Sequence, residues 1–179
     1  MALRVGRRVG WALAILAGAL GAGALGAGAV AAKDPPARET PSGLPVPRYV
    51  SLKFDPVNAR AGPGDDHRLL WVFHAKGMPV QVVAETAEWR RICDPEGTLS
   101  WVHKRTTDGA RTVMRTAAGA TPIRRSPNAA APIDAYLAAK APAALDRCDK
   151  GWCKVQVGSV KGWVDAGAVW GANDAPQCR

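Results

Sequence analysis

The strongest constraint on the fold is a unit of about sixty residues that occurs twice in the chain. Four pairs of matching residues have nearly the same separation: 64 positions for Arg60 and Arg124, 63 for Pro79 and Pro142, 63 for Trp89 and Trp152, and 62 for Trp101 and Trp163. Chance matches would give scattered separations, whereas one that drifts by single residues at loops indicates two copies of one unit. The chain is therefore expected to contain two small domains in tandem.

Each copy consists of short β-prone runs separated by turn residues. The first copy opens at residues 57–64 with V-N-A-R-A-G-P-G, in which Gly-Pro-Gly ends a strand and forces a loop. This pattern favours an all-β barrel or sandwich over a helical fold. The expected strands are residues 49–53, 57–60, 69–74, 79–86, 88–93 and 99–103 in the first copy, and 112–115, 121–124, 133–137, 142–147, 151–157 and 160–165 in the second. A single 3₁₀ turn is expected at residues 166–169.

The order of these motifs resembles that of the bacterial SH3 domain, a small extracytoplasmic barrel. The motifs are V-N-A-R-A-G-P-G, then K-G-M-P-V-Q-V at residues 76–82, E-W-R-R-I at 88–92 and S-W-V at 100–102. The second copy departs from the pattern at Pro122, Ile123 and Asn128. The resemblance covers about residues 49–171 and implies two SH3-like barrels, at residues 49–108 and 109–171, with a C-terminal tail at 172–179.

A barrel of this size buries a modest core, so large aromatic side chains are expected to support it. Four tryptophans recur at matching positions and are interpreted as framework: Trp89, Trp101, Trp152 and Trp163. The alternative is that their rings line a ligand groove, as in SH3 domains that bind proline-rich peptides. Trp170 follows the last strand and is expected to close the end of the second barrel.

Residues 1–31 have the parts of a secretory signal peptide. Arg4, Arg7 and Arg8 precede an uncharged stretch at residues 9–32, and Ala29-Val30-Ala31 forms a small-residue cleavage site. The alternative is an uncleaved membrane anchor, because about twenty apolar residues span a bilayer. The dominance of Gly and Ala over Leu favours cleavage, so the protein is expected to be exported to the periplasm or cell envelope.

Residues 32–48 are rich in proline and charge and are expected to form an extended linker. The alternative is an N-terminal arm that packs on the first barrel through Leu44, Val46 and Tyr49. The last few residues of this segment are expected to pack.

The chain has four cysteines and is expected to reach an oxidising compartment. Cys148 and Cys153 flank a predicted hairpin turn, and facing hairpin positions bring Cβ atoms within bonding range, so a disulfide between them is predicted. Cys93 and Cys178 either pair, which would bring the tail back over the first copy, or remain free thiols.

Trp71 is the candidate for an exposed aromatic. An offset of 63 aligns it with Asp134, and a position that accepts Trp in one copy and Asp in the other is not expected to be core. A ligand contact and packing against the second barrel are both open for this side chain.

The predicted ligand site combines Trp71 with the loop after the opening strand. In the first copy this loop carries Asp65, Asp66, His67 and Arg68, whereas the second copy has alanines at residues 129–131. A specific site needs convergent polar groups beside an exposed apolar surface. The first copy is therefore predicted to carry recognition, and the second to act as a spacer or stabilising partner.

No catalytic residue, metal site or cofactor is predicted. Cys93 and His103 are a conceivable thiol nucleophile and base, as in cysteine peptidases that carry bacterial SH3 domains. Against this, no stretch of a hundred residues is left for a catalytic domain. No C-x-x-C or H-x-x-x-H spacing occurs, and Gly62-Pro63-Gly64 lacks the lysine and helix of a phosphate-binding loop.

The charge of the chain bears on its partners. There are 24 Lys and Arg against 15 Asp and Glu, and removal of residues 1–31 takes away three arginines and leaves a net charge of +6. Interspersed positive charge suits an anionic surface such as phospholipid headgroups or a cell-wall polymer. Nucleic acid is not expected as a partner, because an exported protein does not normally meet it.

These observations predict an exported, non-enzymatic binding protein. The resemblance implies a cell-wall (peptidoglycan) or envelope protein ligand. The alternative is an adaptor for an envelope enzyme complex, with membrane contact only through an uncleaved N-terminal segment.

Overall fold

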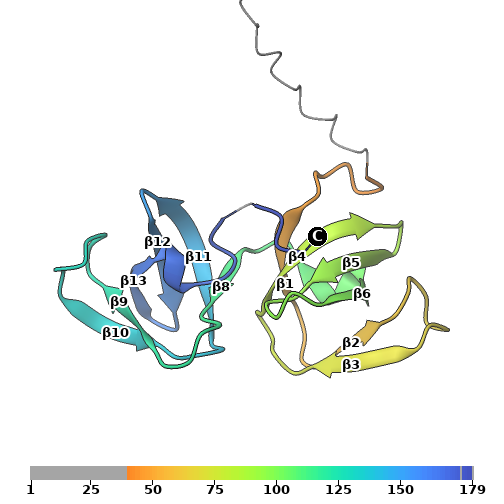
Figure 1. Ribbon diagram of the computed structural model, residues 1–179, viewed down its shortest axis with the longest axis horizontal. Helices are drawn as coiled ribbons and strands as arrows, with labels where there is room; N and C mark the ends of the chain where they lie inside the picture. Colours follow the sequence, from red (N-terminus) through yellow and green to blue (C-terminus); the bar gives the residue numbers. More distant parts are fainter. Residues whose placement is uncertain (1–39, 174, 179) are drawn as a thin grey trace, which may run out of the picture. The chain divides into compact units, whose positions relative to one another are not determined.

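The structure, a computed structural model, describes residues 40–173 and 175–178, which belong to one compact unit. They form two antiparallel sheets, one after the other along the chain (Figure 1). The expected all-β tandem architecture is confirmed. The predicted signal peptide and the linker as far as residue 39 lie outside the described residues. No helix in the described part of the chain is long and apolar enough to cross a membrane.

The first sheet has seven strands in the spatial order β3-β2-β6-β5-β4-β1-β7. Its strands are β1 (Arg48–Leu52), β2 (Val57–Arg60), β3 (Leu69–Phe73), β4 (Pro79–Glu85), β5 (Trp89–Cys93), β6 (Leu99–His103) and β7 (Thr107–Asp108). A 3₁₀ helix, η1 (Lys104–Thr106), joins β6 to β7. Neither η1 nor β7 was expected from the sequence.

The second sheet repeats this arrangement with six strands in the order β10-β9-β13-β12-β11-β8. Its elements are β8 (Thr112–Met114), β9 (Thr121–Arg124), β10 (Ile133–Leu137), β11 (Pro142–Asp149), β12 (Trp152–Val157), β13 (Val160–Asp165) and a final 3₁₀ helix, η2 (Ala166–Ala168). The predicted strands in both copies agree with these bounds to within two residues.

The strand pairings leave both sheets open, so closed barrels are not observed. β3 and β7 are the outer strands of the first sheet, and β10 and β8 those of the second. Closure requires the two outer strands to pair along their length. β7 has two residues, both paired with β1, and β8 has three, so neither forms a long edge.

Each sheet encloses its own aliphatic core. The first contains Val50, Leu52, Val57, Val80, Val82, Ile92 and Val102, and the second Val113, Ile123, Leu137, Val155 and Val164, each with a few further residues. The four framework tryptophans are half-buried and belong to neither core. Side chains alternate along a strand, so Val102 and Val164 point inward while the preceding tryptophans lie on the outer face.

The two sheets share a packed contact. Met114 on β8 belongs to the core of the first sheet. The backbone of Met114 also exchanges two hydrogen bonds of 2.8 and 3.0 Å with Trp170. The ring of Trp170 stands edge-on to that of Tyr49 on β1, with centroids 4.9 Å apart. Trp170 therefore contacts the first sheet, which sequence reasoning missed.

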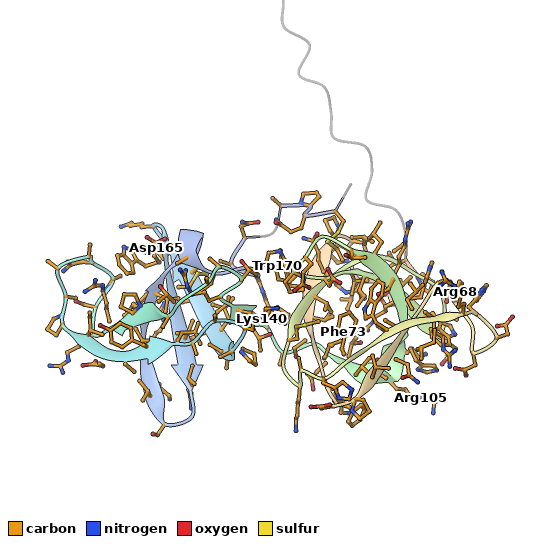
Figure 2. The ribbon with its side chains drawn as sticks, turned by 60° about the horizontal axis from the view of Figure 1, so that its bottom comes forward. Arg68, Phe73, Arg105, Lys140, Asp165 and Trp170 are labelled. Atoms are coloured by element: carbon orange, nitrogen blue, oxygen red, sulfur yellow. A yellow bond between two sulfur atoms is a disulfide. The ribbon has the colours of Figure 1, made fainter. Side chains whose placement is uncertain are left out.

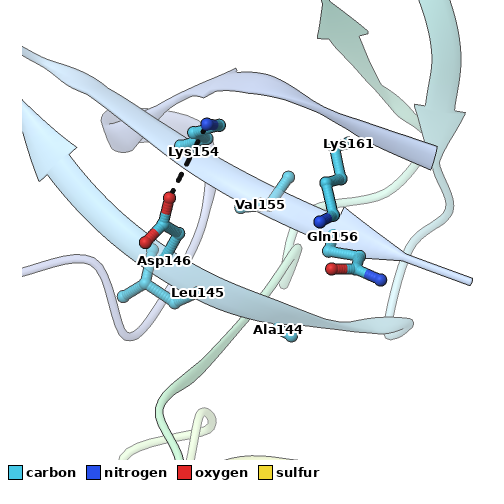
Figure 3. A pocket seen from close by; sticks show the side chains of 7 residues that line it. All are labelled: Ala144, Leu145, Asp146, Lys154, Val155, Gln156 and Lys161. Atoms are coloured by element: carbon cyan, nitrogen blue, oxygen red, sulfur yellow. Dashed lines mark ion pairs between the residues drawn. The ribbon is translucent and has the colours of Figure 1, made fainter. Parts of the chain in front are cut away.

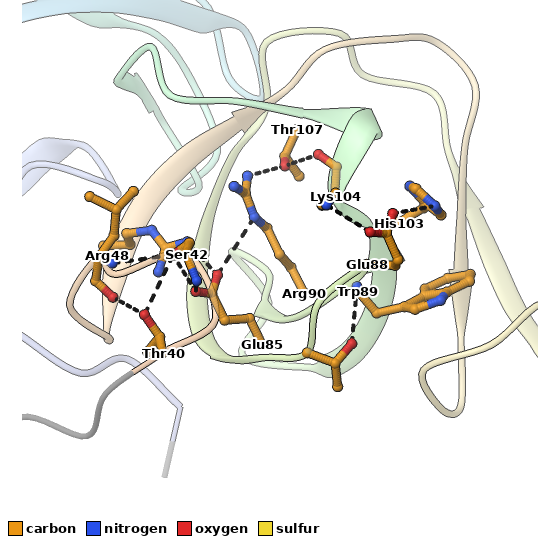
Figure 4. Close-up of polar contacts among 12 residues, drawn as sticks. Thr40, Ser42, Arg48, Glu85, Glu88, Trp89, Arg90, His103, Lys104 and Thr107 are labelled. Atoms are coloured by element: carbon orange, nitrogen blue, oxygen red, sulfur yellow. Dashed lines mark hydrogen bonds and ion pairs between the residues drawn. The ribbon is translucent and has the colours of Figure 1, made fainter.

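Residues 40–47 pack on the first sheet through Glu85, at the end of β4 (Figure 4). The backbone N–H of Ser42 donates to the Glu85 carboxylate at 3.0 Å, and the Arg48 guanidinium pairs with it at 2.5 Å. Burial alone would raise the pKa of Glu85, but hydrogen bonds from Ser42 and Arg48 lower it from 4.5 to about 2. Val46 packs against the core, while Leu44 is exposed. This part of the predicted linker is thus a docked arm.

Candidate functional site

A pocket of about 200 Å³ lies in the first sheet, where the start of β2, the loop after it, β5 and the end of β6 meet. It is lined by Pro56, Val57, Asn58, Arg60, Asp65, Trp89, His103 and Thr106. The lining combines an aromatic ring, an imidazole and both signs of charge within a small volume.

Arg60 positions the loop that borders the pocket. Its Nη1 donates to the carbonyl oxygen of His67 at 2.9 Å, and its Nη2 lies 3.2 Å from the Asp65 carboxylate. The His67 ring lies against Gly62, where a Cβ atom would come within 2.6 Å of it, so a larger residue at position 62 would displace the ring. These contacts hold Asp65 at the pocket although its side chain is 85% exposed.

Trp89 and His103 form the opposite wall. They face each other across β5 and β6, with ring centroids 5.2 Å apart. His103 Nδ1 accepts the backbone N–H of Arg105 at 3.2 Å, so in the neutral ring the proton lies on Nε2, which is 3.8 Å from the Glu88 carboxylate (Figure 4). A hydrogen bond from Lys104 in turn lowers the pKa of Glu88 below its usual range.

The repeat, the two sheets and this geometry agree with a comparison to known families, in which the family model described as bacterial SH3 domain matches residues 53–109 and 117–171. The chain belongs to the bacterial SH3 domain family. We call β1 to β7 the first SH3 unit and β8 to β13 the second SH3 unit.

Two solved structures are similar to this chain at low identity. NlpC2 from Trichomonas vaginalis is 13% identical, with 69% of this chain and 48% of that chain covered and a TM-score of 0.31. NlpC1 from the same organism is 12% identical, with coverage of 69% and 45% and a TM-score of 0.31. The chain thus spans less than half the length of either structure. No curated protein gives a significant match to the sequence.

The residues of the predicted ligand site lie in two different places. Asp65 lines the pocket beside Trp89, and Asp66, His67 and Arg68 are exposed on the same loop, where Figure 2 labels Arg68. Trp71 lines another pocket, of about 250 Å³, with Phe73, Asp94, Glu96 and Thr98. Trp71 and Asp65 thus line different pockets.

Trp71 packs against the core of the first SH3 unit, contrary to the expectation from its alignment with Asp134. It pairs with Ala59 across β2 and β3, whereas Ile123 pairs with Ala135 across β9 and β10. Both hairpins contain a register shift at the same place, so the offset here is 64 and Trp71 matches Ala135. The Trp71 ring is half-buried and lies edge-on to Phe73 at 6.1 Å.

Sequence reasoning missed Trp89 and His103 as residues of the pocket. Trp89 was interpreted as framework because it recurs as Trp152, and His103 was considered as a conceivable catalytic base. The available signal was their cross-strand register: the partner of Trp152 is Asp165, so the repeated tryptophan faces a different side chain in each unit. At the loop, Ala129 stands in place of Asp65.

The structure contains two disulfides. Cys148 and Cys153, the pair expected from the sequence, face each other on β11 and β12 with Cα atoms 4.0 Å apart. Cys93 on β5 is joined to Cys178 in the tail, with Cα atoms 5.8 Å apart. The sequence left open whether Cys93 and Cys178 pair or remain free thiols. The structure shows the pair, which brings the tail over the first SH3 unit.

Proposed function

We propose that the protein is an exported, non-enzymatic binding protein whose first SH3 unit recognises a cell-wall peptide or an envelope protein. The observation that carries this proposal is the pocket where Trp89, His103, Arg60 and Asp65 converge. Aromatic surface with a few placed polar groups is typical of ligand sites. The match to tandem bacterial SH3 domains supports a binding role.

The ligand class follows from the groups that line the pocket. The face of Trp89 suits an apolar or planar group, while Arg60 and Asp65 complement a carboxylate and an amine or amide. Short peptides carry all of these, including the peptides of a bacterial cell wall. The signal-peptide pattern of residues 1–31 supports export to the compartment where such ligands occur.

Two observations support a function without catalysis. The Cys93 sulfur, the candidate nucleophile, is in a disulfide with Cys178. Its candidate base lies elsewhere: Cys93 pairs with Leu99 at one end of the β5–β6 ladder, and His103 pairs with Trp89 at the other.

The proposal is tested by sedimenting the protein with isolated peptidoglycan sacculi. We expect the full chain to sediment, and Trp89→Ala to weaken binding by about 1–3 kcal/mol, the usual cost of truncating a buried interface anchor. Trp152→Ala is the matched control, since it removes the equivalent ring of the second SH3 unit. Asp65→Ala alters a side chain that is 85% exposed and removes one exposed ion pair with Arg60, so its effect on stability should be below about 1 kcal/mol.

The result that would overturn the proposal is equal loss of binding in Trp89→Ala and Trp152→Ala, with Asp65→Ala unchanged. Failure to sediment, combined with cross-linking of the protein to an envelope enzyme through this pocket, would favour the adaptor function and exclude wall recognition.

A further inference from the structure

The outer face of β4 and β5 in the first SH3 unit has a direct equivalent in the second. Gln81 pairs with Cys93 across these strands, and Ala144 pairs with Gln156 across β11 and β12. Both pairs follow the offset of 63 residues. The same place on the two sheets can therefore be compared residue by residue.

In the first SH3 unit this place is occupied by the C-terminal tail. Gln81 Nε2 donates to the carbonyl oxygen of Ala175 at 2.9 Å, and Gln81 Oε1 accepts the backbone N–H of Gln177 at 2.9 Å. Cys93 is bonded to Cys178. Gln81 and Cys93 are both fully buried as a result.

The Gln81 amide binds the backbone of the tail, and no side chain of the tail takes part in either hydrogen bond. It contacts a carbonyl and an N–H two residues apart, which is the spacing offered by one edge of an extended strand. This face of the sheet is therefore shaped to hold an extended segment.

In the second SH3 unit the equivalent face is open. Ala144 and Gln156 are exposed and line a pocket of about 350 Å³ that runs along β11, β12 and β13 (Figure 3). The remaining lining residues are Leu145, Asp146, Lys154, Val155 and Lys161. The amide group is again present, but on the neighbouring strand: Gln156 stands where the first unit has Cys93. Its Nε2 donates one hydrogen to the carbonyl oxygen of Gly158 at 2.9 Å. The second Nε2 hydrogen and Oε1 are the groups with which it would pair with a bound segment.

The charge of this open face differs from that of the occupied one. Lys161 faces Gln156 across β12 and β13, where the first unit has Leu99 facing Cys93. Lys154 lies beside it and is 3.8 Å from Asp146, the one acidic residue of the lining. Residues 109–171 as a whole carry nine basic and four acidic residues, whereas residues 49–108 carry eight of each.

We infer that the open face of the second SH3 unit binds an extended acidic segment of a partner polypeptide. The Gln156 amide pairs with the backbone of that segment, and Lys154 and Lys161 pair with its carboxylates. The second SH3 unit is then a binding module with its own partner, and this site is independent of the pocket beside Trp89.

The probe is a fluorescein-labelled peptide of repeated Ser-Glu, titrated with the full chain and followed by fluorescence anisotropy. A peptide of repeated Ser-Gln has the same length and no charge, and we expect it to bind at least about fivefold more weakly. In nuclear magnetic resonance spectra the Ser-Glu peptide should shift the amide signals of Ala144, Gln156 and Lys161, and leave those of Gln81 and Cys93 unchanged.

Two single substitutions separate a specific site from diffuse attraction. Lys161→Glu should weaken binding by about fivefold. Lys150→Glu makes the same charge change on an exposed turn of the same unit, outside the pocket, and should have little effect. Gln156→Ala should also weaken binding by about fivefold, because it removes the backbone contact.

Three outcomes would overturn the inference. Equal effects of Lys161→Glu and Lys150→Glu would indicate net charge alone. Shifts confined to the Asp65 to Arg68 loop would place the peptide on the first SH3 unit. Binding to phosphatidylglycerol vesicles that Ser-Glu peptide does not displace, with no binding of the peptide itself, would assign the face to a membrane.

Discussion

One cross-strand position is filled by different chemistry in the two SH3 units. Glu85 on β4 faces Arg90 on β5, and the equivalent pair on β11 and β12 is Cys148 and Cys153. In the first unit Glu85 is also the residue that holds the docked arm. In the second unit a disulfide between Cys148 and Cys153 joins the equivalent two positions.

Glu85→Gln tests the role of the carboxylate in the first SH3 unit. Loss of a carboxylate that is 3% exposed and accepts hydrogen bonds from Ser42 and Arg48 should lower the free energy of unfolding at pH 7 by about 1–3 kcal/mol. Because the folded-state pKa is about 2, the advantage of wild type over the variant should be complete above pH 4.5 and disappear as the pH falls towards 2. Urea denaturation across this range measures it.

The control for Glu85 is Glu96→Gln, since the Glu96 side chain is 64% exposed and its nearest cation is 3.9 Å away. That variant should change stability by less than about 0.5 kcal/mol. A wild-type advantage over Glu85→Gln that grows as the pH falls would contradict the assigned role of the carboxylate.

Cys148→Ser with Cys153→Ser tests the contribution of the disulfide in the second SH3 unit. The bond closes a loop between residues five positions apart, so chain entropy predicts a loss of about 2 kcal/mol in the free energy of unfolding. Urea denaturation of wild type and of the double variant, both without reductant, measures this loss, because reductant would also break the Cys93–Cys178 bond. Alkylation of both Cys148 and Cys153 in oxidised wild-type protein would exclude the bond.

At the scale of elements, the hairpins β2–β3 and β9–β10 place their large and small side chains on opposite strands at one equivalent cross-strand pair. The first places Ala59 opposite Trp71, and the second places Ile123 opposite Ala135. Ala59 and Ile123 are both buried, and the residue opposite each is half-buried against the core. In each hairpin the alanine of this pair therefore faces a large side chain on the opposite strand, Trp71 in the first and Ile123 in the second.

Trp71→Ala should therefore destabilise the first SH3 unit by about 2–3 kcal/mol, less than for a fully buried tryptophan. Adding Ala59→Ile should recover about 1 kcal/mol of this loss, because it reproduces the packing of the second hairpin. Chemical denaturation of the single and double variants measures both effects. If the double variant is less stable than Trp71→Ala alone, the two hairpins do not share this packing rule.

The strands themselves were predictable, because alternation and turn residues are local signals. β7 and η1 were missed since a strand of two residues carries no period, and η1 depends on the His103 side chain capping Arg105. The error at Trp71 arose from the loop between β3 and β4, which is one residue longer than the loop between β10 and β11. The offset of 63 that holds from β4 onward therefore misaligns β3 by one residue and exchanges the two faces of the strand. The pocket beside Trp89 required knowing which strands are neighbours.

At the scale of the whole molecule, the Cys93–Cys178 bond is expected to contribute more than the hairpin disulfide. It joins residues 85 positions apart, which corresponds to about 4.5 kcal/mol of loop-closure entropy. Cys93→Ser with Cys178→Ser should lower the free energy of unfolding by roughly that amount. Hydrogen exchange of the Gln177 backbone N–H, which donates to Gln81, should increase as the tail detaches. Unchanged exchange would show that the tail stays bound without the bond.

The proposed export gives a prediction for the N-terminus. Mass spectrometry of protein recovered from the periplasm should give a mature chain that begins at Ala32 or Lys33, because a small-residue cleavage site ends at Ala31. Recovery of the full-length chain in the membrane fraction would instead support an uncleaved anchor.

The Cys93–Cys178 bond also determines how the molecule carries mechanical load. The whole second SH3 unit lies between these two cysteines, inside a covalent loop. A pulling force between the docked arm and the end of the tail passes from β5 directly to Cys178 and bypasses every strand from β6 to β13. About 300 Å of chain contour is thereby shielded from extension while the bond is intact.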